Sequence, residues 1–177
     1  NGSGKTVLLK LICGFMKPDS GTVTVNGKVI GKDADFPENT GIIIEAPGFL
    51  PNYSGMKNLE YLASIRGKIG KEQIESAMKT VGFDPSSKLR VGKYSLGMKQ
   101  CLGIAQAIME DQQLLILDEP MNALDKDAVE EMRRLFLSFK ASGKTMLIVS
   151  HNEGDISTLC DEVYEFDGAK IKNRESR

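Results

Sequence analysis

The chain has few cysteines, no long apolar run and almost no net charge, and each shortage excludes a class of protein. Among its 177 residues are three cysteines, Cys13, Cys101 and Cys160, which lie far apart and form no C-x-x-C pair. An odd, scattered set favours reduced thiols in a cytosolic protein over a disulfide framework or a zinc site. No apolar run approaches the roughly 20 residues that a membrane-spanning helix needs. The net charge of −1 gives no electrostatic basis for binding nucleic acid, so we expect no such partner.

The sequence also lacks an initiator methionine and the first residue of the motif with which it opens. It begins with the residues Asn1, Gly2, Ser3, Gly4, Lys5 and Thr6. This run matches the end of a phosphate-binding loop, G-x-x-x-x-G-K-[ST], whose leading glycine would lie two positions before Asn1. In such a loop backbone N–H groups surround the phosphates, the lysine reaches the β- and γ-phosphates, and the threonine hydroxyl binds magnesium. The alternative is a glycine-rich turn before an ordinary helix.

Helical and strand patterns alternate along most of the chain. Helical spacing occurs at 7–15, 56–65, 71–81, 95–109 and 126–141, and strand patterns occur at 22–25, 41–45, 114–117 and 146–149, with a closing hairpin at 162–171. Long apolar strands between helices predict an α/β fold with a mostly parallel sheet covered on both faces. The purely helical stretch from Met56 to Met109 predicts an inserted helical subdomain. We therefore expect one domain over 1–177, with its core at 1–50 and 112–177 and the helical subdomain at about 51–111.

Two adjacent carboxylates follow the most apolar strand pattern. Leu114 to Leu117 are all apolar, and Asp118 and Glu119 come directly after them. Because burying unpaired charge is costly, this strand must end at a polar site. In a magnesium–phosphate cluster, Asp118 would hold the ion and Glu119 would orient or deprotonate the attacking water. An exposed strand end with solvated carboxylates is the alternative, which the phosphate-loop sequence makes less favoured.

A second anion-binding pattern opens the helix at 95–109. The Ser95 hydroxyl and the Gly97 N–H would lie at a helix N-terminus, where the helix dipole favours negative charge. The simpler interpretation of this segment alone is that Ser95 is an N-cap.

In their order and over nearly the whole chain, these motifs resemble those of the nucleotide-binding domain of ABC transporters. The resemblance implies a P-loop NTPase core with a mostly parallel sheet, a small antiparallel part and an inserted helical subdomain. It also implies that residues 94–98 correspond to the L-S-G-G-Q signature, in which Ser95 and Gly97 bind the γ-phosphate of ATP held by a second ATP-binding subunit. Leu96 and Met98 depart from that pattern.

The resemblance assigns roles to three further segments. Residues 122–125 resemble the loop that crosses to the partner subunit, although Asp125 can also cap the following helix. His151 is the only histidine and matches the family's switch histidine, which contacts the γ-phosphate, whereas a lone histidine is otherwise more often structural. Glu45 stands where the family usually has a glutamine that touches magnesium and senses the membrane partner. A third carboxylate near Asp118 and Glu119 makes magnesium necessary to offset their repulsion.

Two short segments resemble a narrower group. Residues 45–51 with Ser54-Gly55, and residues 94–100, are similar to ATPases of lantibiotic-immunity and bacteriocin-type peptide transporters. Phe49, Leu50 and Tyr53 either pack within the helical subdomain or line the groove that receives a helix of the membrane subunit.

The resemblance implies a magnesium-dependent ATPase subunit that forms a homo- or heterodimer around two ATP molecules. It would drive a separate transmembrane permease from the cytoplasmic face of the cell membrane, with antimicrobial peptides or drug-like compounds as candidate cargo. Lys5, Thr6 and Asp118 would bind Mg–ATP, Glu119 would be the general base, and His151 and Glu45 would support it.

Two alternatives stay open on the sequence alone. One is a soluble ABC-type ATPase without transport, although such proteins usually carry two tandem nucleotide domains or a coiled-coil insertion. The other is an ATP-binding module that never turns over. We also expect residues 1–177 alone to bind ATP poorly and to fold marginally, because a P-loop needs the strand that feeds it.

Overall fold

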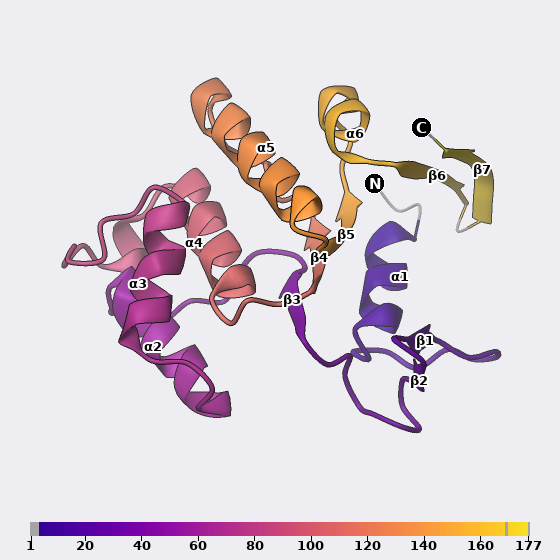
Figure 1. Ribbon diagram of the computed structural model, residues 1–177, viewed down its shortest axis with the longest axis horizontal. Helices are drawn as coiled ribbons and strands as arrows, with labels where there is room; N and C mark the ends of the chain where they lie inside the picture. The colour runs from indigo at the N-terminus through magenta and orange to yellow at the C-terminus, as the bar shows by residue number, and fades with distance from the viewer. Residues whose placement is uncertain (1–3, 169, 177) are drawn as a thin grey trace.

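The computed structural model describes residues 4–168 and 170–176 and places a small parallel sheet between helices (Figure 1). The helices are α1 (Lys5–Ile12), α2 (Gly55–Arg66), α3 (Lys71–Thr80), α4 (Leu96–Ile108), α5 (Lys126–Ala141) and α6 (Glu153–Leu159), with a 3₁₀ turn at Val91–Lys93. The strands are β1 (Thr24–Val25), β2 (Lys28–Val29), β3 (Thr40–Ile43), β4 (Leu114–Asp118), β5 (Thr145–Val149), β6 (Glu162–Asp167) and β7 (Lys170–Ser176). Asn1, Gly2 and Ser3 of the predicted phosphate loop lie outside the described residues.

Strands β3, β4 and β5 form one parallel sheet in that order. Thr40 of β3 lies opposite Leu114 of β4, which lies opposite Thr145 of β5, so the three strands start at the same level. The strand pairs β1–β2 and β6–β7 are antiparallel hairpins. The predicted α/β fold, with a parallel sheet and a small antiparallel part, is therefore confirmed.

Alternate residues of β4 bury opposite faces of the sheet. Leu115 and Leu117 join the larger core, which also contains buried residues of α2 to α5. Ile116 packs against Leu9 and Cys13 at the end of α1 on the other face. Burial raises the pKa of the Cys13 thiol to about 11, so this thiol stays protonated at neutral pH. Helices on both faces explain why the strand residues are apolar without alternation.

Two glycines bring α4 close to the sheet and its following loop. A Cβ at Gly41 of β3 would lie 1.9 Å from the carbonyl oxygen of Ala107, and a Cβ at Gly103 would lie 2.9 Å from Cγ of Pro47. Helix α4 also packs on α2 and α3, so the helical stretch shares one core with the sheet. The division into 1–50 with 112–177, and about 51–111, stays a prediction.

Differences from the predicted elements have local causes. The helix predicted at 7–15 begins at Lys5 and ends at Ile12, because Gly14 has a φ of 77°, which terminates an α-helix. The strand predicted at 22–25 is confined to Thr24–Val25, before a turn in which Asn26 and Gly27 both have positive φ. Sequence patterns did not predict α6, whose seven residues are too few for periodicity. In the described part of the chain, no helix has both the length and the hydropathy that crossing a membrane requires.

Candidate active site

Loops at the carboxyl ends of the three parallel strands meet the start of α1 around a cavity of about 740 Å³. Open parallel sheets bind ligands outside these strand ends. The cavity is lined by Gly4, Lys5, Thr6, Val7, Glu45, Ala46, Leu96, Gln100, Asp118, Glu119, Asn122, Val149 and His151. It brings together most of the predicted site residues of the described chain, whereas Ser95 and Gly97 do not line it.

The N-terminus of α1 faces this cavity. Gly4 has a φ of 90°, and its carbonyl oxygen accepts the first helical hydrogen bond, from the Leu8 N–H at 2.9 Å. The first turn of α1 contains no acidic residue, so its backbone N–H groups and the positive end of the helix dipole are available to an anion. Lys5 adds a positive charge at the same place. This end of α1 can therefore bind phosphate.

The Thr6 hydroxyl donates a hydrogen bond of 2.9 Å to Oδ2 of Asp118, across 112 residues of sequence. Asp118 is the last residue of β4, and Thr6 lies in the first turn of α1. Together they present a hydroxyl and a carboxylate, the hard oxygen ligands that Mg²⁺ prefers. Among the described residues, no group of three His, Cys, Asp or Glu side chains is placed to hold a metal. Magnesium is usually bound by one or two carboxylates together with substrate phosphates, so Asp118 with the Thr6 hydroxyl is a donor set of the kind it requires.

Glu119 is held by its backbone, while one carboxylate oxygen is left without a hydrogen bond. Its N–H donates to the Val149 carbonyl at 2.9 Å, and its carbonyl accepts from Nε2 of Gln100 at 3.1 Å. Oε1 is buried with no hydrogen-bond partner and lies 3.5 Å from Nε2 of His151. A buried oxygen in this state costs about 1–3 kcal/mol, and such atoms in native folds often mark catalytic or ligand sites. Glu119 therefore has a fixed backbone and a free carboxylate oxygen, as a general base that accepts a proton from a bound substrate requires.

Two strained residues, Glu45 and Glu119, line the cavity, and a third, Ala123, directly follows the lining residue Asn122. Among the described residues, six non-glycine residues have positive φ, and three of these are Asn or Asp, which tolerate that conformation. The others are Glu45 at 60°, Glu119 at 49° and Ala123 at 64°. Such strain costs on the order of 1–3 kcal/mol per residue and tends to cluster at functional sites.

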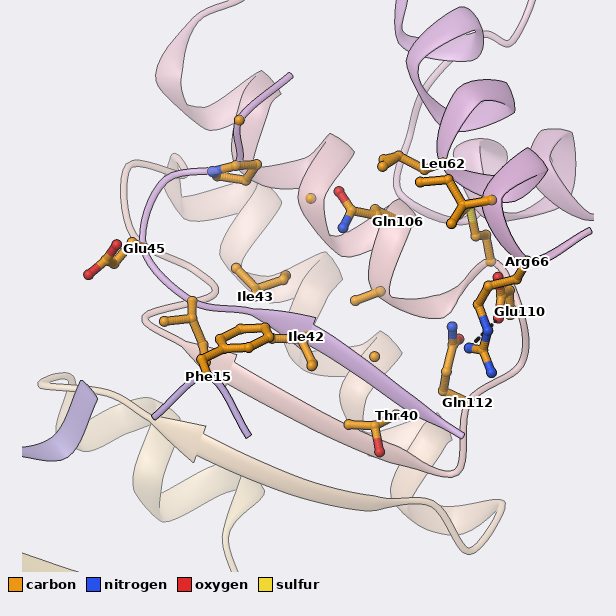
Figure 2. Close-up of a pocket in the computed structure, with 18 of the residues that line it drawn as sticks. Phe15, Thr40, Ile42, Ile43, Glu45, Leu62, Arg66, Gln106, Glu110 and Gln112 are labelled. Carbon is orange, nitrogen blue, oxygen red and sulfur yellow. Dashed lines mark hydrogen bonds and ion pairs between the residues drawn. The ribbon is translucent and has the colours of Figure 1, made fainter. Parts of the chain in front are cut away.

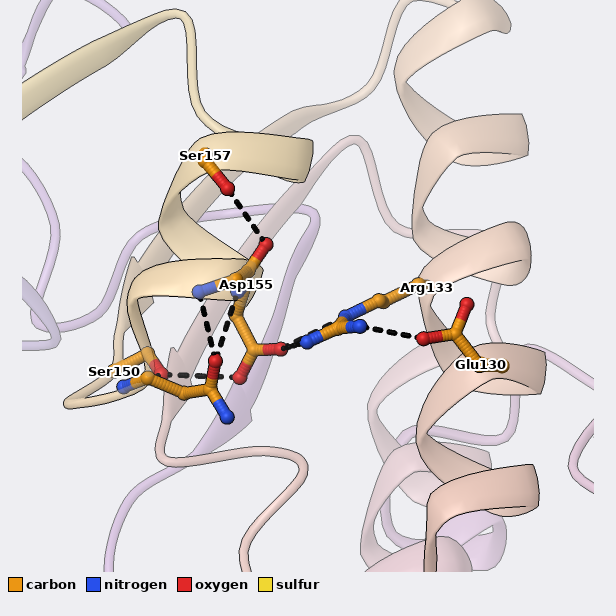
Figure 3. A network of polar contacts seen from close by, with 7 residues as sticks. Glu130, Arg133, Ser150, Asp155 and Ser157 are labelled. Carbon is orange, nitrogen blue, oxygen red and sulfur yellow. Dashed lines mark hydrogen bonds and ion pairs between the residues drawn. The ribbon is translucent and has the colours of Figure 1, made fainter.

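A polar network holds the loop that carries His151 (Figure 3). Asp155 of α6, which is buried, accepts hydrogen bonds from Arg133 of α5 at 2.6 and 2.9 Å and from the Ser150 hydroxyl at 3.2 Å. The Ser150 hydroxyl accepts in turn from the N–H of Asn152 at 3.0 Å. Since Ser150 and Asn152 flank His151, the network fixes the backbone on both sides of that histidine.

The change Asp155→Asn should therefore loosen the His151 loop. We expect a loss of about 2 kcal/mol of stability, the value of a hydrogen bond to a charged group, which corresponds to a melting temperature lower by about 4–8 °C. Turnover should fall about tenfold through misplacement of His151. Calorimetry and a phosphate-release assay measure the two effects. Asp19→Asn, at an exposed position, is the matched control, and equal values for the two variants would contradict the positioning role.

Glu45 lies beyond the strand that was predicted to contain it. Strand β3 ends at Ile43, and the left-handed backbone of Glu45 turns the chain out of the sheet, so the predicted strand 41–45 is too long. The Glu45 carboxylate lies 2.6 Å from Nζ of Lys10 on α1.

Ser95 and Gly97 have structural roles within this chain. The Ser95 hydroxyl accepts from the N–H of Met98 at 3.1 Å, so the predicted N-cap is present. A Cβ at Gly97 would lie 2.7 Å from the carbonyl oxygen of Ala123. Asp125 caps α5 by accepting from the Ala128 N–H at 2.9 Å. A phosphate-binding role for Ser95 and Gly97 stays a prediction.

Sequence reasoning missed two positioning residues, Gln100 and Asp155. Gln100 is a mostly buried amide between Gly97 and Ile104 on one face of α4, and a polar residue on an apolar helical face is the signal that could have indicated it. Asp155 gives no comparable signal, because its partner Arg133 lies 22 residues earlier.

The chain matches the family model described as ABC transporter over residues 1–122. It is 39% identical to the uncharacterized ABC transporter ATP-binding protein YybJ of Bacillus subtilis, over 99% of this chain and 80% of YybJ. It is 41% identical to the bacitracin transport ATP-binding protein BcrA of Bacillus licheniformis, over 92% of this chain but only 54% of BcrA. The lantibiotic transport ATP-binding protein SrtF of Streptococcus pyogenes is 34% identical, with 99% and 76% covered.

Solved structures share the fold. The dimeric structure of MJ0796, a bacterial ABC transporter cassette, superposes with a TM-score of 0.86 at 20% identity and covers 99% of this chain and 82% of that one. This likeness confirms the predicted P-loop NTPase architecture.

Proposed function

The chain belongs to the ABC transporter family of ATP-binding proteins, and we propose that it binds and hydrolyses ATP to drive a membrane permease. The observation that carries this proposal is the meeting of Thr6, Asp118 and Glu119 at the N-terminus of α1, beside His151. Phosphoryl transfer to water requires a phosphate-binding group, oxygen ligands for magnesium and a general base. This one cavity contains candidates for all three.

Binding of the nucleotide uses the start of α1. The first-turn N–H groups and Lys5 receive the β- and γ-phosphates. Thr6 and Asp118 would hold magnesium, which when bound neutralises charge that develops on the phosphate oxygens. Their mutual hydrogen bond of 2.9 Å keeps both side chains at this position in the described structure.

Hydrolysis uses Glu119 as the general base. The carboxylate accepts a proton from water while the water oxygen bonds to the γ-phosphorus and the bond to the ADP oxygen breaks, which gives ADP and inorganic phosphate. The backbone bonds to Val149 and Gln100 hold Glu119 in place during this step. His151, whose Nε2 lies 3.5 Å from the same carboxylate, would contact the γ-phosphate.

A second ATP-binding subunit completes the site. Leu96, between Ser95 and Gly97, is 62% exposed at the start of α4. The helix N-terminus there can present Ser95 and Gly97 to the γ-phosphate of the partner's ATP. The turn at 122–125 packs against Gly97 and would cross to the partner with it. The dimeric structures of related cassettes support this arrangement.

A second cavity, of about 440 Å³, supports docking of the permease (Figure 2). It lies between β3 and the helices α2 and α4, and its rim carries the exposed apolar side chains of Phe15 and Ile65. At one end Arg66 pairs with Glu110 at 2.7 Å, and Oε1 of Gln112 is buried without a hydrogen bond. A donor on an inserted helix would satisfy that oxygen. Phe49, Leu50 and Tyr53, predicted from sequence to line such a groove or to pack internally, do not line this cavity; Phe49 packs on the core.

The cargo we propose is an antimicrobial peptide. This choice is supported by the printed functions of two relatives, bacitracin transport for BcrA and lantibiotic transport for SrtF. The subunit would then act at the cytoplasmic face of the membrane, through the permease.

The change Lys5→Ala in the full-length protein tests the proposal. Removing a charge that faces the phosphates should lower ATPase activity by about 100-fold and should abolish peptide tolerance in cells that depend on the transporter. Lys17→Ala, at an exposed position outside the cavity, is the control. Phosphate release and peptide tolerance are the measurements. Unchanged phosphate release in Lys5→Ala would contradict the proposed site. If Lys5→Ala loses phosphate release but cells keep their peptide tolerance, the result would favour a soluble ATPase that does not drive transport.

A further inference from the structure

Lys10 links helix α1 to the loop that follows β3. It lies one turn after Thr6, so both side chains project from the same face of α1. Thr6 reaches Asp118, and Lys10 reaches the carboxylate of Glu45 at 2.6 Å. Two adjacent positions on one helix face therefore contact two different acidic residues of the cavity wall.

The Glu45 loop is fixed from both sides. Glu45 itself has a left-handed backbone, which an L-residue keeps only where its surroundings determine it. On one side is the Lys10 ion pair, and on the other Pro47 packs where Gly103 leaves room on α4. Figure 2 shows the Glu45 side chain directed away from the other labelled residues of the groove. Its carboxylate therefore points away from the groove, and Glu45 also lines the active-site cavity.

The Lys10–Glu45 ion pair affects ligand binding because the cavity carries more negative than positive side chains. Among the described residues, the cavity is lined by three carboxylates, Glu45, Asp118 and Glu119, but by one lysine, Lys5. The ligand proposed for the cavity is itself strongly negative. An uncompensated carboxylate at position 45 would repel it, and Lys10 offsets that carboxylate without lining the cavity.

We propose that Lys10 is a positioning residue that neutralises and holds Glu45, and so sets the affinity of the site for nucleotide and its dependence on magnesium. This inference rests on the proposed ATP binding. Without Lys10, the free Glu45 carboxylate opposes the phosphates, and more magnesium is needed to offset it.

The test is a double-mutant cycle in the full-length protein, read by titration with a fluorescent ATP analogue. We expect Lys10→Met to raise the Kd about three- to tenfold in EDTA, and less in excess magnesium. In a Glu45→Gln background the same change should have no effect. Lys10→Arg, which keeps the positive charge, should retain wild-type affinity. Lys28→Met, which removes another surface ion pair of 2.8 Å outside the cavity, is the matched control.

Each outcome separates this inference from the proposed function. If the wild-type protein binds no nucleotide, or if Lys5→Ala binds as well as wild type, the proposed function fails. If wild type binds and Lys5→Ala does not, but Lys10→Met matches wild type, the role of Lys10 is overturned. An equal effect of Lys10→Met in the wild-type and Glu45→Gln backgrounds would also overturn it, because Lys10 would then act only as a general charge. Both side chains are partly or largely exposed, so we expect unchanged melting temperatures throughout.

Discussion

Replacing Glu119 by glutamine will abolish ATP hydrolysis and leave ATP bound in a stable dimer. Glutamine keeps the shape of glutamate but cannot accept the proton of the attacking water, so turnover should fall by about 10²–10⁴-fold. The backbone bonds to Val149 and Gln100 do not involve the carboxylate, and they hold residue 119 where it is. Loss of the negative charge beside the γ-phosphate should also strengthen ATP binding. Binding of ATP and breakdown of ATP are thereby separated.

Phosphate release and size-exclusion chromatography with ATP measure the two parts of this prediction. The control is Glu131→Gln, at an exposed position on α5, which should keep wild-type turnover and should not accumulate a dimer. Near-normal turnover in Glu119→Gln would remove Glu119 from its role as the base. Loss of turnover without a dimer would instead question the proposed second subunit.

Gly41→Ala will destabilise the fold more than any other alanine substitution considered in this chain. The new Cβ would lie 1.9 Å from the carbonyl oxygen of Ala107 and 2.8 Å from its carbon. Both are backbone atoms, so no side chain can move aside and α4 must shift from β3. Overpacking of this kind costs about 3 kcal/mol or more, which lowers the melting temperature by about 10 °C in a chain of this size.

Thermal unfolding followed by circular dichroism checks this prediction. Gly48→Ala is the matched control, because a Cβ there meets nothing within 4 Å and the backbone needs no positive φ. Helix α4 carries Gln100, which holds the Glu119 carbonyl, so turnover should fall together with stability in Gly41→Ala. A melting temperature equal to that of Gly48→Ala would show that α4 and β3 are not in close contact.

The parts of the fold that local sequence determines could be predicted. Helix α5 follows from apolar spacing and from the Asp125 cap, and β4 follows from four apolar residues that end at Asp118. The site could be predicted in part for the same reason. Carboxyl ends of parallel strands meet at one edge, so Asp118 and His151 had to come near each other and near the start of α1.

The parts that depend on distant contacts could not be predicted. The Glu45–Lys10 pair joins residues 35 positions apart, and nothing in the local sequence indicates it. The end of β3 is set by the left-handed backbone of Glu45, although the apolar pattern continues through Ile44. The close approach that requires Gly41 depends on where α4 crosses the sheet, which periodicity does not define.

The three strained residues in and beside the cavity also limit which substitutions could make this protein more resistant to heat. A glycine would adopt the backbone of Glu45, Glu119 or Ala123 without steric conflict, but at two of these positions it would remove a carboxylate of the cavity. Only Ala123 combines the strain with a side chain that carries no chemistry. Stability and catalysis therefore compete at residues 45 and 119 and are separable at residue 123, where directed evolution of a more robust variant should begin.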